Sequence, residues 1–395
     1  MNSSSQVIQD RHDGLDEATV RKLRSNEFPW TDGAVYLNNA STGPLPERTR
    51  RVLDDLTLKR MTPHHLDEQD IRDRLAETRS AVARLIGAHS DEIALAANTG
   101  YGINVAAQAL PLVPGDRVIV SAGEFPTNVY PWLHLRHRGI EVDLVPTTPC
   151  GWPDEDAMVE RLEDSRVRVL AVSWVQFSTG FRADLARLSR ACRDAGCFLV
   201  VDGIQGVGQA PLNVADTPVD LLSCGGQKWL LSPWGSGFLY VRRELLDTIV
   251  PPIVGWMAFE GTDDFTRLTD YSGALRADGR RFEQVTMPYQ DLLGMNESVK
   301  LLLELGLEEI EAWLRQVKQP LVDAASEGAI RIESPTDGEH ESAIVSVRTS
   351  DTERSFRKLE LANVACSFRE GAIRLAPHCY NLPQEMDRVV SLLME

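Results

Sequence analysis

The sequence lacks the cysteine pairs on which disulfide-bonded domains and zinc sites depend. Its six cysteines, at positions 150, 192, 197, 224, 366 and 379, are scattered and form no CxxC pair. Neither a disulfide framework nor a metal site is therefore predicted. Free thiols fit a reducing compartment, so we expect a cytoplasmic protein.

Long apolar runs and an excess of positive charge are missing as well. No run approaches the roughly 18 apolar residues that span a bilayer, so we expect no membrane partner. The polar residues 1–16 lack the apolar core of a secretory signal and are predicted to form a flexible leader. With 41 Lys and Arg against 58 Asp and Glu, the net charge is −17. Because such a surface repels nucleic-acid phosphates, nucleic acid is not an expected partner.

Short apolar runs alternate with helical patterns through the middle of the 395-residue chain. This alternation predicts an α/β fold with a mostly parallel sheet that helices cover on both faces. Ligands on such sheets bind at the carboxyl ends of the strands. Buried strands are expected at residues 117–121, 141–145, 167–173, 197–202 and 220–223, with helices such as residues 184–195 between them.

The length of the chain predicts a large domain and a smaller one. Residues 17–90, helical over residues 45–87, are expected to pack with the small domain, and residues 91–290 to form the large domain. Residues 291–395 are predicted to form a small α+β domain, and a long helical stretch from residue 287 to about 322 is predicted to link the two. The small domain is expected to contain strands at residues 341–347, 363–368 and 372–375 and helices at residues 352–361 and 383–394.

Two charged residues stand where predicted strands end. Asp202 ends the apolar run FLVVD, so its carboxylate is expected at the carboxyl edge of the sheet. Lys228 lies in SCGGQKWLL, where apolar neighbours are expected to desolvate its amine, lower its pKa and make it nucleophilic. The alternatives are an Asp–Gly turn at position 202 and a loop lysine that extends to solvent at position 228.

Three further segments offer groups that bind an anion or a ring. In AANTGYGIN, the N–H groups of Thr99 and Gly100 and the Thr99 hydroxyl stand at the start of a helix predicted over residues 101–110. A phosphate binds readily there, although a plain N-cap is the alternative. Phe125 follows a strand and is placed to stack on a ligand ring, unless it is a core aromatic. Arg374 lies inside an apolar strand, so its charge needs either a substrate carboxylate or a structural salt bridge.

These residue types meet the requirements of pyridoxal 5′-phosphate (PLP). The cofactor needs a lysine that forms a Schiff base, which Lys228 offers, and a carboxylate that keeps the pyridine nitrogen protonated, which Asp202 offers. The helix start at residues 99–100 supplies donors for the phosphate, and Arg374 supplies a cation for the substrate carboxylate. Gln205 follows Asp202 closely and is placed to reach the phenolic oxygen of the ring.

Seven segments in order give the sequence a family resemblance from Tyr36 to Leu393. The chain resembles a class V aminotransferase of the fold type I PLP superfamily, the group that includes cysteine desulfurases and selenocysteine lyases. The resemblance implies a large PLP-binding domain with a seven-stranded, mostly parallel sheet and a smaller α+β C-terminal domain. The segments are YLNNASTGPLP, AANTGYGIN, EFPTNVYPW, VDGIQ, GGQKWLLSPWGSGFLY, RFEQVTMP and IRLAPHCYN.

The resemblance implies roles for further residues. Gln227 takes a phosphate-contacting position, and Thr286 matches a residue that reaches the phosphate from the neighbouring subunit. A homodimer with active sites at the subunit interface is therefore expected. Asn39 and Ala40 match the N-terminal loop that lines the pocket for a small, amino-acid-like substrate.

The sequence also departs from the family pattern. Phe125 stands where most close relatives have a histidine, so it can stack on the ring but cannot relay protons. Gln227 replaces a second histidine and can donate to phosphate but cannot titrate. Phe177 occupies a position that often carries a polar contact to the ring, and Gln176 or Ser178 is a candidate to replace that contact.

The resemblance implies that the substrate amine displaces Lys228, which then removes the Cα proton and leaves a quinonoid. The first interpretation is an aminotransferase that acts on an amino acid or a related substrate. A C–S or C–Se β-lyase comes second, although Cys366 lies in a strand–turn–strand pattern with no room for the persulfide-bearing loop of desulfurases. We interpret Cys366 as a small core residue. An amino-acid epimerase and a decarboxylating deaminase remain alternatives, whereas the retained Lys228, Asp202 and Arg374 argue against a non-catalytic scaffold.

Overall fold

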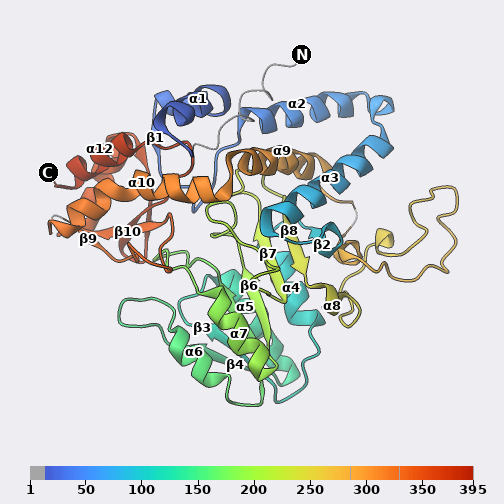
Figure 1. The fold of residues 1–395 in the computed structure, drawn as a ribbon. Helices are drawn as coiled ribbons and strands as arrows, with labels where there is room; N and C mark the ends of the chain where they lie inside the picture. The colour runs from blue at the N-terminus through green and yellow to red at the C-terminus, as the bar shows by residue number, and fades with distance from the viewer. Residues whose placement is uncertain (1–13, 285, 329, 395) are drawn as a thin grey trace.

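A seven-stranded sheet forms the centre of the large domain (Figure 1) in the computed structural model, which describes residues 14–284, 286–328 and 330–394. Its strands are β2 (Ile93–Leu95), β3 (Arg117–Ser121), β4 (Glu141–Val145), β5 (Val167–Ser173), β6 (Phe198–Asp202), β7 (Leu221–Gly225) and β8 (Gly237–Val241). They pair in the order β2-β8-β7-β6-β5-β3-β4. β8 runs antiparallel to β2 and β7, and the other neighbours are parallel. The predicted α/β fold class is confirmed.

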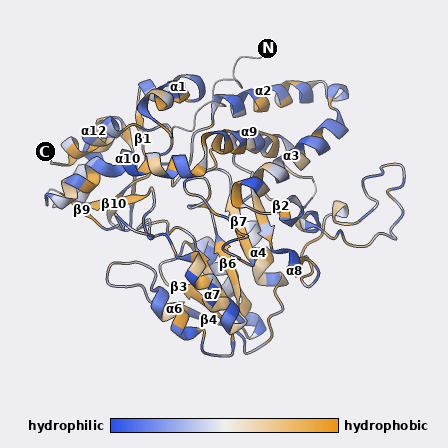
Figure 2. Cartoon of the chain, in the orientation of Figure 1, coloured by the Kyte–Doolittle hydropathy of each residue, from blue (hydrophilic) through white to orange (hydrophobic). Residues whose placement is uncertain are grey.

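Successive residues of each strand face opposite layers of helices, because side chains alternate along a strand. In β3, Val118 and Val120 join the apolar cluster under α4 (Thr99–Ala109) and α5 (Tyr130–His134). Ile119 joins the cluster under α6 (Glu155–Arg161) and α7 (Leu185–Ala195). Figure 2 shows the resulting concentration of hydrophobic residues in β6 and β7, whereas α2 (Glu47–Met61) is mostly hydrophilic.

The N-terminal segment contacts both parts of the molecule. Its helices are α1 (Glu17–Glu27), α2 and α3 (Glu68–Ile86), and α2 and α3 pack against α9 (Tyr289–Leu305). Strand β1 (Val35–Tyr36) pairs in parallel with β11 (Val364–Ala365) near the C-terminus. The short helix α8 (Arg243–Leu246) follows the sheet, and single 3₁₀ turns lie at residues 29–32, 63–65, 90–92, 126–128, 135–138, 256–258 and 279–282.

The C-terminal part forms a four-stranded antiparallel sheet in the order β12-β13-β10-β9. The strands are β9 (Arg331–Ile332), β10 (Val345–Arg348), β12 (Ser367–Arg369) and β13 (Ala372–Leu375). One face, with Val347 and Ile373, packs in an apolar cluster with α10 (Leu307–Ser326), α11 (Thr352–Leu361) and α12 (Pro383–Met394). The opposite face is left for contacts with the large domain.

Two predicted strands are wrong in detail, whereas the predicted helical stretch is present. It consists of two helices, because Gly306 has φ 82° and ends α9 before α10 begins. The strand predicted from residue 341 begins at Val345, since residues 342 and 343 bond to the large domain instead. The strand predicted over residues 363–368 is interrupted at Cys366, because β11 pairs with β1 whereas β12 pairs with β13 in a different sheet.

Two further predictions concern the domain boundaries and the N-terminal leader. Residues 1–13 of the predicted leader lie outside the described residues, and Asp16 caps α1 by accepting a hydrogen bond from the N–H of Thr19. The division at residues 90 and 290 stays a prediction. None of the helices in the described ranges combines the length and apolar character needed to cross a membrane.

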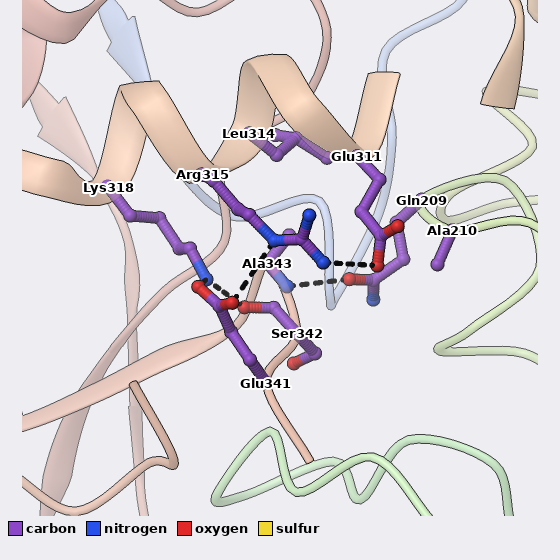
Figure 3. Close-up of a pocket in the computed structure, with 9 residues that line it drawn as sticks. All are labelled: Gln209, Ala210, Glu311, Leu314, Arg315, Lys318, Glu341, Ser342 and Ala343. Atoms are coloured by element: carbon purple, nitrogen blue, oxygen red, sulfur yellow. Dashed lines mark hydrogen bonds and ion pairs between the residues drawn. The ribbon is translucent and has the colours of Figure 1, made fainter. Parts of the chain in front are cut away.

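Figure 3 shows a polar junction where α10 meets both the segment 341–343 and the large domain. The Lys318 ammonium, with 3% of its side chain exposed, lies 2.7 Å from a Glu341 carboxylate oxygen and also donates to the Ser342 carbonyl. Gln209 of the large domain accepts from the Ala343 N–H at 2.7 Å. Burial lowers the pKa of Lys318 and the Glu341 carboxylate opposes that shift, so the ion pair stabilises the charged form of this side chain inside the protein.

We predict that Glu341→Gln destabilises the protein by about 3 kcal/mol, because it leaves the Lys318 ammonium buried without its counter-ion. The double variant Lys318→Met, Glu341→Gln removes that stranded charge and recovers most of the loss. Urea unfolding measures both. The matched control is Glu353→Gln, because Glu353 and its partner Arg357 are both exposed. It is expected to leave the urea midpoint near that of wild type. Equal effects of Glu341→Gln and Glu353→Gln would contradict the stabilising role of the buried ion pair.

Candidate functional site

The structure brings Asp202 and Lys228 to the same edge of the large sheet. Asp202 is the last residue of β6, and Lys228 follows the end of the neighbouring parallel strand β7 by three positions. The Asp202 carboxylate accepts from the N–H of Ile204 at 3.0 Å. No other donor among the described residues reaches this carboxylate, which is therefore free to meet a ligand. The turn predicted as an alternative at position 202 is present as well, since the Ile204 contact is that of an Asx turn.

Burial shifts these two groups in opposite directions. It raises the pKa of Asp202 to about 6 and lowers the pKa of Lys228 to about 8, because a poorly solvated site disfavours either charge. Each group counteracts the shift of the other. The Lys228 Nζ has no hydrogen-bonding partner within the described ranges and lies 5.6 Å from the centre of the Phe125 ring. The predicted desolvation of the lysine is confirmed, and the solvent-extended alternative is wrong.

The start of α4 provides a cradle of backbone N–H groups beside this pair. Asn98 caps the helix by accepting from Tyr101, so the helix begins at Thr99 rather than at the predicted residue 101. The N–H groups of Thr99 and Gly100 therefore lie in the first turn, where no intrahelical acceptor exists and an anion binds well.

A glycine keeps that cradle open toward Gln227. A Cβ added at Gly225 would lie 2.6 Å from Gln227 Oε1 and 3.3 Å from Thr99 Oγ1. The N–H of Gly225 also donates to Thr99 Oγ1 at 2.9 Å. The absence of a side chain at Gly225 therefore lets Thr99 and Gln227 lie close together at the start of α4, beside N–H groups that suit a phosphate. The buried carboxyl, the unpaired amine and this cradle together fit PLP.

Two aromatic rings border the amine. Phe125 is 42% exposed, so the alternative that it is a core aromatic is wrong. Its ring contacts Phe177 edge-on, with centroids 5.3 Å apart. The proposed replacements for a polar contact, Gln176 and Ser178, are already engaged: Gln176 Oε1 accepts from Ser178 Oγ and Gln176 Nε2 donates to the Gly123 carbonyl, each at 2.8 Å. Both side chains thus brace this loop.

Gln205 connects the site to the N-terminal loop. Its Nε2 donates to the Ala40 carbonyl at 3.0 Å and its Oε1 accepts from Trp229 Nε1 at 2.8 Å. Gly43 lies directly against the lysine loop: its N–H donates to the Gln227 carbonyl at 2.8 Å, and an added Cβ would lie 2.1 Å from the Lys228 carbonyl. The loop that holds Asn39 and Ala40 is therefore packed onto the lysine.

The side chain of Asn39 faces the C-terminal segment. Its Nδ2 donates to the Ala376 carbonyl at 2.7 Å and its Oδ1 accepts from the Tyr380 hydroxyl at 2.8 Å. It is fully buried. Asn39 thus positions the loop, and the predicted substrate contacts of Asn39 and Ala40 remain predictions. The Ser41 side chain of the same loop does contact a predicted site residue, Arg374. The sequence did not indicate this role for Ser41.

Arg374 is 2% exposed, and neutral oxygen atoms surround it. It donates to the Phe177 carbonyl at 2.7 Å, to Ser41 Oγ at 2.8 Å and to Ser367 Oγ at 3.1 Å. No carboxylate of the described chain pairs with it, so the structural salt-bridge alternative is wrong there. Burial lowers its pKa to about 10. A buried cation without a counter-ion is suited to a substrate carboxylate.

Glu124 is a second buried carboxyl that sequence reasoning missed. Its oxygens accept from the N–H of Ser173 at 2.7 Å, from the Ser173 hydroxyl and from Asn128 Nδ2 at 3.2 Å. Burial raises its pKa to about 7 and nearby Asp202 adds to the rise. Glu124 ties the loop that carries Phe125 to the end of β5. The signal available in the sequence was an acidic residue three positions after a strand and immediately before Phe125.

The last two predicted residues lie elsewhere. Thr286 is exposed in the segment between the sheet and α9, and its predicted contact with the phosphate of a neighbouring subunit stays a prediction. Cys366 is half-buried at the break between β11 and β12, and burial raises its pKa to about 12. All six cysteines are free, and no group of three metal-ligating side chains occurs in the described part of the chain.

Comparisons with known proteins extend the likeness over almost the whole chain. A sequence profile described as "Aminotransferase class-V" matches residues 35–383. The "Uncharacterized aminotransferase YcbU" of Bacillus subtilis is 26% identical over 363 residues, 92% of this chain and 94% of that protein. "Cysteine desulfurase CsdA" of Escherichia coli is 30% identical over 309 residues, 75% of each chain. The apo structure of a cysteine desulfurase from Thermococcus onnurineus has a TM-score of 0.84 at 21% identity and covers 95% of this chain and 97% of its own.

The lowered pKa of Lys228 predicts how the cofactor-free protein takes up PLP. The neutral amine is the nucleophile, so the uptake rate rises with pH and levels off above about pH 8. Stopped-flow absorbance from about pH 6 to pH 10 measures the profile. A rate that keeps rising toward 10.5, the ordinary value for lysine, would contradict the burial effect, and Lys228→Ala abolishes the visible band.

Proposed function

The chain belongs to the aminotransferase class-V family, whose members are PLP-dependent enzymes, and we propose that it transfers the amino group of an amino acid through Lys228. The observation that carries this proposal is the unpaired, desolvated Lys228 amine within electrostatic reach of the buried Asp202 carboxyl. When bound, PLP supplies an electron-accepting ring that stabilises negative charge at the substrate Cα. The residues of the chain then control position and protons.

Each predicted residue has a defined task in this proposal. The Asp202 carboxylate holds a proton on the pyridine nitrogen, and its deep burial strengthens that contact. The N–H groups of Thr99 and Gly100, with Gln227, bind the phosphate at the start of α4. Gln205 lies near the phenolic oxygen, and Phe125 stacks on the ring.

Arg374 and Lys228 act on the substrate itself. Arg374 binds the α-carboxylate by charge-assisted hydrogen bonds and so orients the Cα–H bond. The Lys228 amine removes the Cα proton as a general base, for which a pKa near 8 is well matched to neutral pH.

The surroundings of Lys228 favour transfer over epimerisation. An epimerase needs acid–base groups on both faces of Cα, whereas the aromatic ring that lies near the Lys228 Nζ, Phe125, cannot transfer protons. His378 offers no acid–base help, because its ring accepts from the Cys379 N–H and contacts the Trp229 carbonyl, and burial lowers its pKa to about 4. One lysine that removes a proton and returns it on the same face suffices for amino transfer.

A C–S lyase is the second candidate, and the relatives named cysteine desulfurases favour it. Cys366 does not support sulfur capture, because it packs against the apolar cluster between β11 and β12 and its raised pKa keeps the thiol protonated. A lyase activity of this chain would thus release sulfur without transfer to Cys366.

Product analysis separates these reactions. Purified holoenzyme is incubated with an amino-acid panel plus 2-oxo acids, and we expect a new amino acid together with the oxo acid of the donor. Pyruvate with sulfide would identify a lyase, and a D-amino acid an epimerase. Lys228→Ala abolishes turnover, whereas Lys59→Ala on exposed α2 retains it. Turnover by Lys228→Ala would overturn the proposal.

We further propose that the enzyme is a homodimer in which Thr286 reaches the phosphate of the partner subunit. The segment between α8 and α9 projects from the large domain (Figure 1) and exposes many large apolar side chains: Val250, Ile253, Val254, Trp256, Phe265, Leu268 and Tyr271. A cavity of about 320 Å³ lies between this segment and α3. Exposed apolar surface of this kind marks a protein interface, and Thr286 lies in the same segment.

Light scattering is expected to give about 88 kDa, twice the 43.9 kDa of one chain. Tyr271→Glu, at a side chain 89% exposed, places a charge in the interface, lowers the mass to that of one chain and weakens PLP binding about tenfold or more. Leu361→Glu on α11, at a side chain 90% exposed, is the matched control and changes neither the molecular mass nor PLP binding. A wild-type monomer with full cofactor occupancy would refute the dimer.

A further inference from the structure

One face of the small sheet is turned toward the large domain. Ser346, Arg374 and Ser367 lie opposite one another in register across β10, β13 and β12. Ser346 Oγ donates to the Ser178 carbonyl, and Arg374 to the Phe177 carbonyl at 2.7 Å. Residues directly opposite one another share a face of a sheet, so this face borders the loop that contains Phe177.

Arg369 lies on the same face as Arg374. It is two positions after Ser367 in β12 and opposite Ala372, so strand alternation places its side chain with that of Ser367. Phe368, between them, points to the other face, where its ring lies 5.7 Å from that of Phe356 on α11. Arg369 and Arg374 are diagonal neighbours across the hairpin, with Cα atoms roughly 7–8 Å apart.

Neither arginine has an anionic partner among the residues that the structure describes. Arg374 donates to neutral oxygens, and the guanidinium of exposed Arg369 donates to the carbonyl of its neighbour Phe368 at 2.8 Å. By contrast, Arg348 on the adjacent strand pairs with Glu333 at 2.7 Å. In a chain of net charge −17, two adjacent arginines without carboxylates form a locally positive surface.

That surface belongs to the candidate active site. The positive charge of Arg369 contributes to lowering the pKa of both Lys228 and Arg374, which agrees with its place on the same face of the sheet as Arg374. The aromatic pair Phe125 and Phe177 lies beside the same group, with Lys228 Nζ near one ring and Arg374 bonded to the backbone of the other. A substrate held by Arg374 therefore has an apolar wall and a second cation within reach.

We propose that Arg369 binds a second anionic group of the substrate, so that the enzyme acts on amino acids whose side chain ends in a carboxylate or a similar anion. This inference rests on the proposed function, in which Arg374 holds the α-carboxylate. Both arginines lie on one face of the β12–β13 hairpin, so a substrate with two carboxylates joined by a few carbon atoms can contact both. The intervening methylene groups contact the Phe125 and Phe177 rings.

Binding of two simple acids to the holoenzyme tests the proposal without turnover. Glutarate carries two carboxylates, whereas valerate has the same chain length and one. By calorimetry we expect glutarate to bind wild type at least tenfold more tightly than valerate. Arg369→Gln raises the Kd of glutarate about ten- to hundredfold and leaves the Kd of valerate unchanged, as expected for a lost charge-assisted contact. The control Arg354→Gln on α11, which removes the same charge from an exposed site, changes neither Kd.

The outcomes separate this inference from the function on which it rests. Equal affinity of the two acids for wild type, or an equal effect of Arg369→Gln on both, would overturn the role of Arg369 while the site survives. Arg374→Gln is expected to weaken the binding of both acids. If it weakens the binding of neither, or if neither acid binds to protein with an intact PLP band, Arg374 does not bind a carboxylate as the proposed function requires. The inference about Arg369 then fails as well.

Discussion

Asp202 is buried and Lys228 is half-buried within electrostatic reach of it, and the chemistry of the site depends on this arrangement. Burial alone would neutralise both groups, while each stabilises the charged form of the other. The sheet creates this arrangement, because β6 and β7 are parallel neighbours with Asp202 opposite Ser223. A register slip of one residue would turn the Asp202 side chain to the other face of the sheet. The order of the central strands is therefore as much part of the site as the two side chains.

The sequence predicted the central fold closely, because buried parallel strands are short apolar runs that are easy to recognise. The bounds of β3, β4, β5 and β13 agree with the prediction residue for residue. The errors in the predicted strands occur where a partner far away in the sequence determines how a segment pairs. The chain changes sheets at Cys366 because β1, more than three hundred residues earlier, offers β11 a partner, and a local pattern does not contain that information.

The same distinction applies to the candidate site. The desolvation of Lys228 followed from its apolar neighbours in the sequence, and Asp202 from the end of its strand. The contacts of Asn39, Ser41 and Gln176 could not be predicted, since short polar side chains pair with whichever backbone group the fold brings near. Asn39 bonds to Ala376, separated from it by 337 positions. The missed Glu124 is similar, because its value as a buried acceptor depends on Ser173 of another strand.

The packing of the N-terminal loop has a consequence for biosynthesis. Residues 35–43 bond to β11 and Ala376, which are made more than three hundred residues later, and place Gly43 against the backbone of Lys228. While the chain is being synthesised, this loop therefore lacks these partners until β11 has left the ribosome. The loop that supports Lys228 is thus held in place later than the central sheet. A chain that stops short of β11 would lack this support for the lysine even with an intact central sheet.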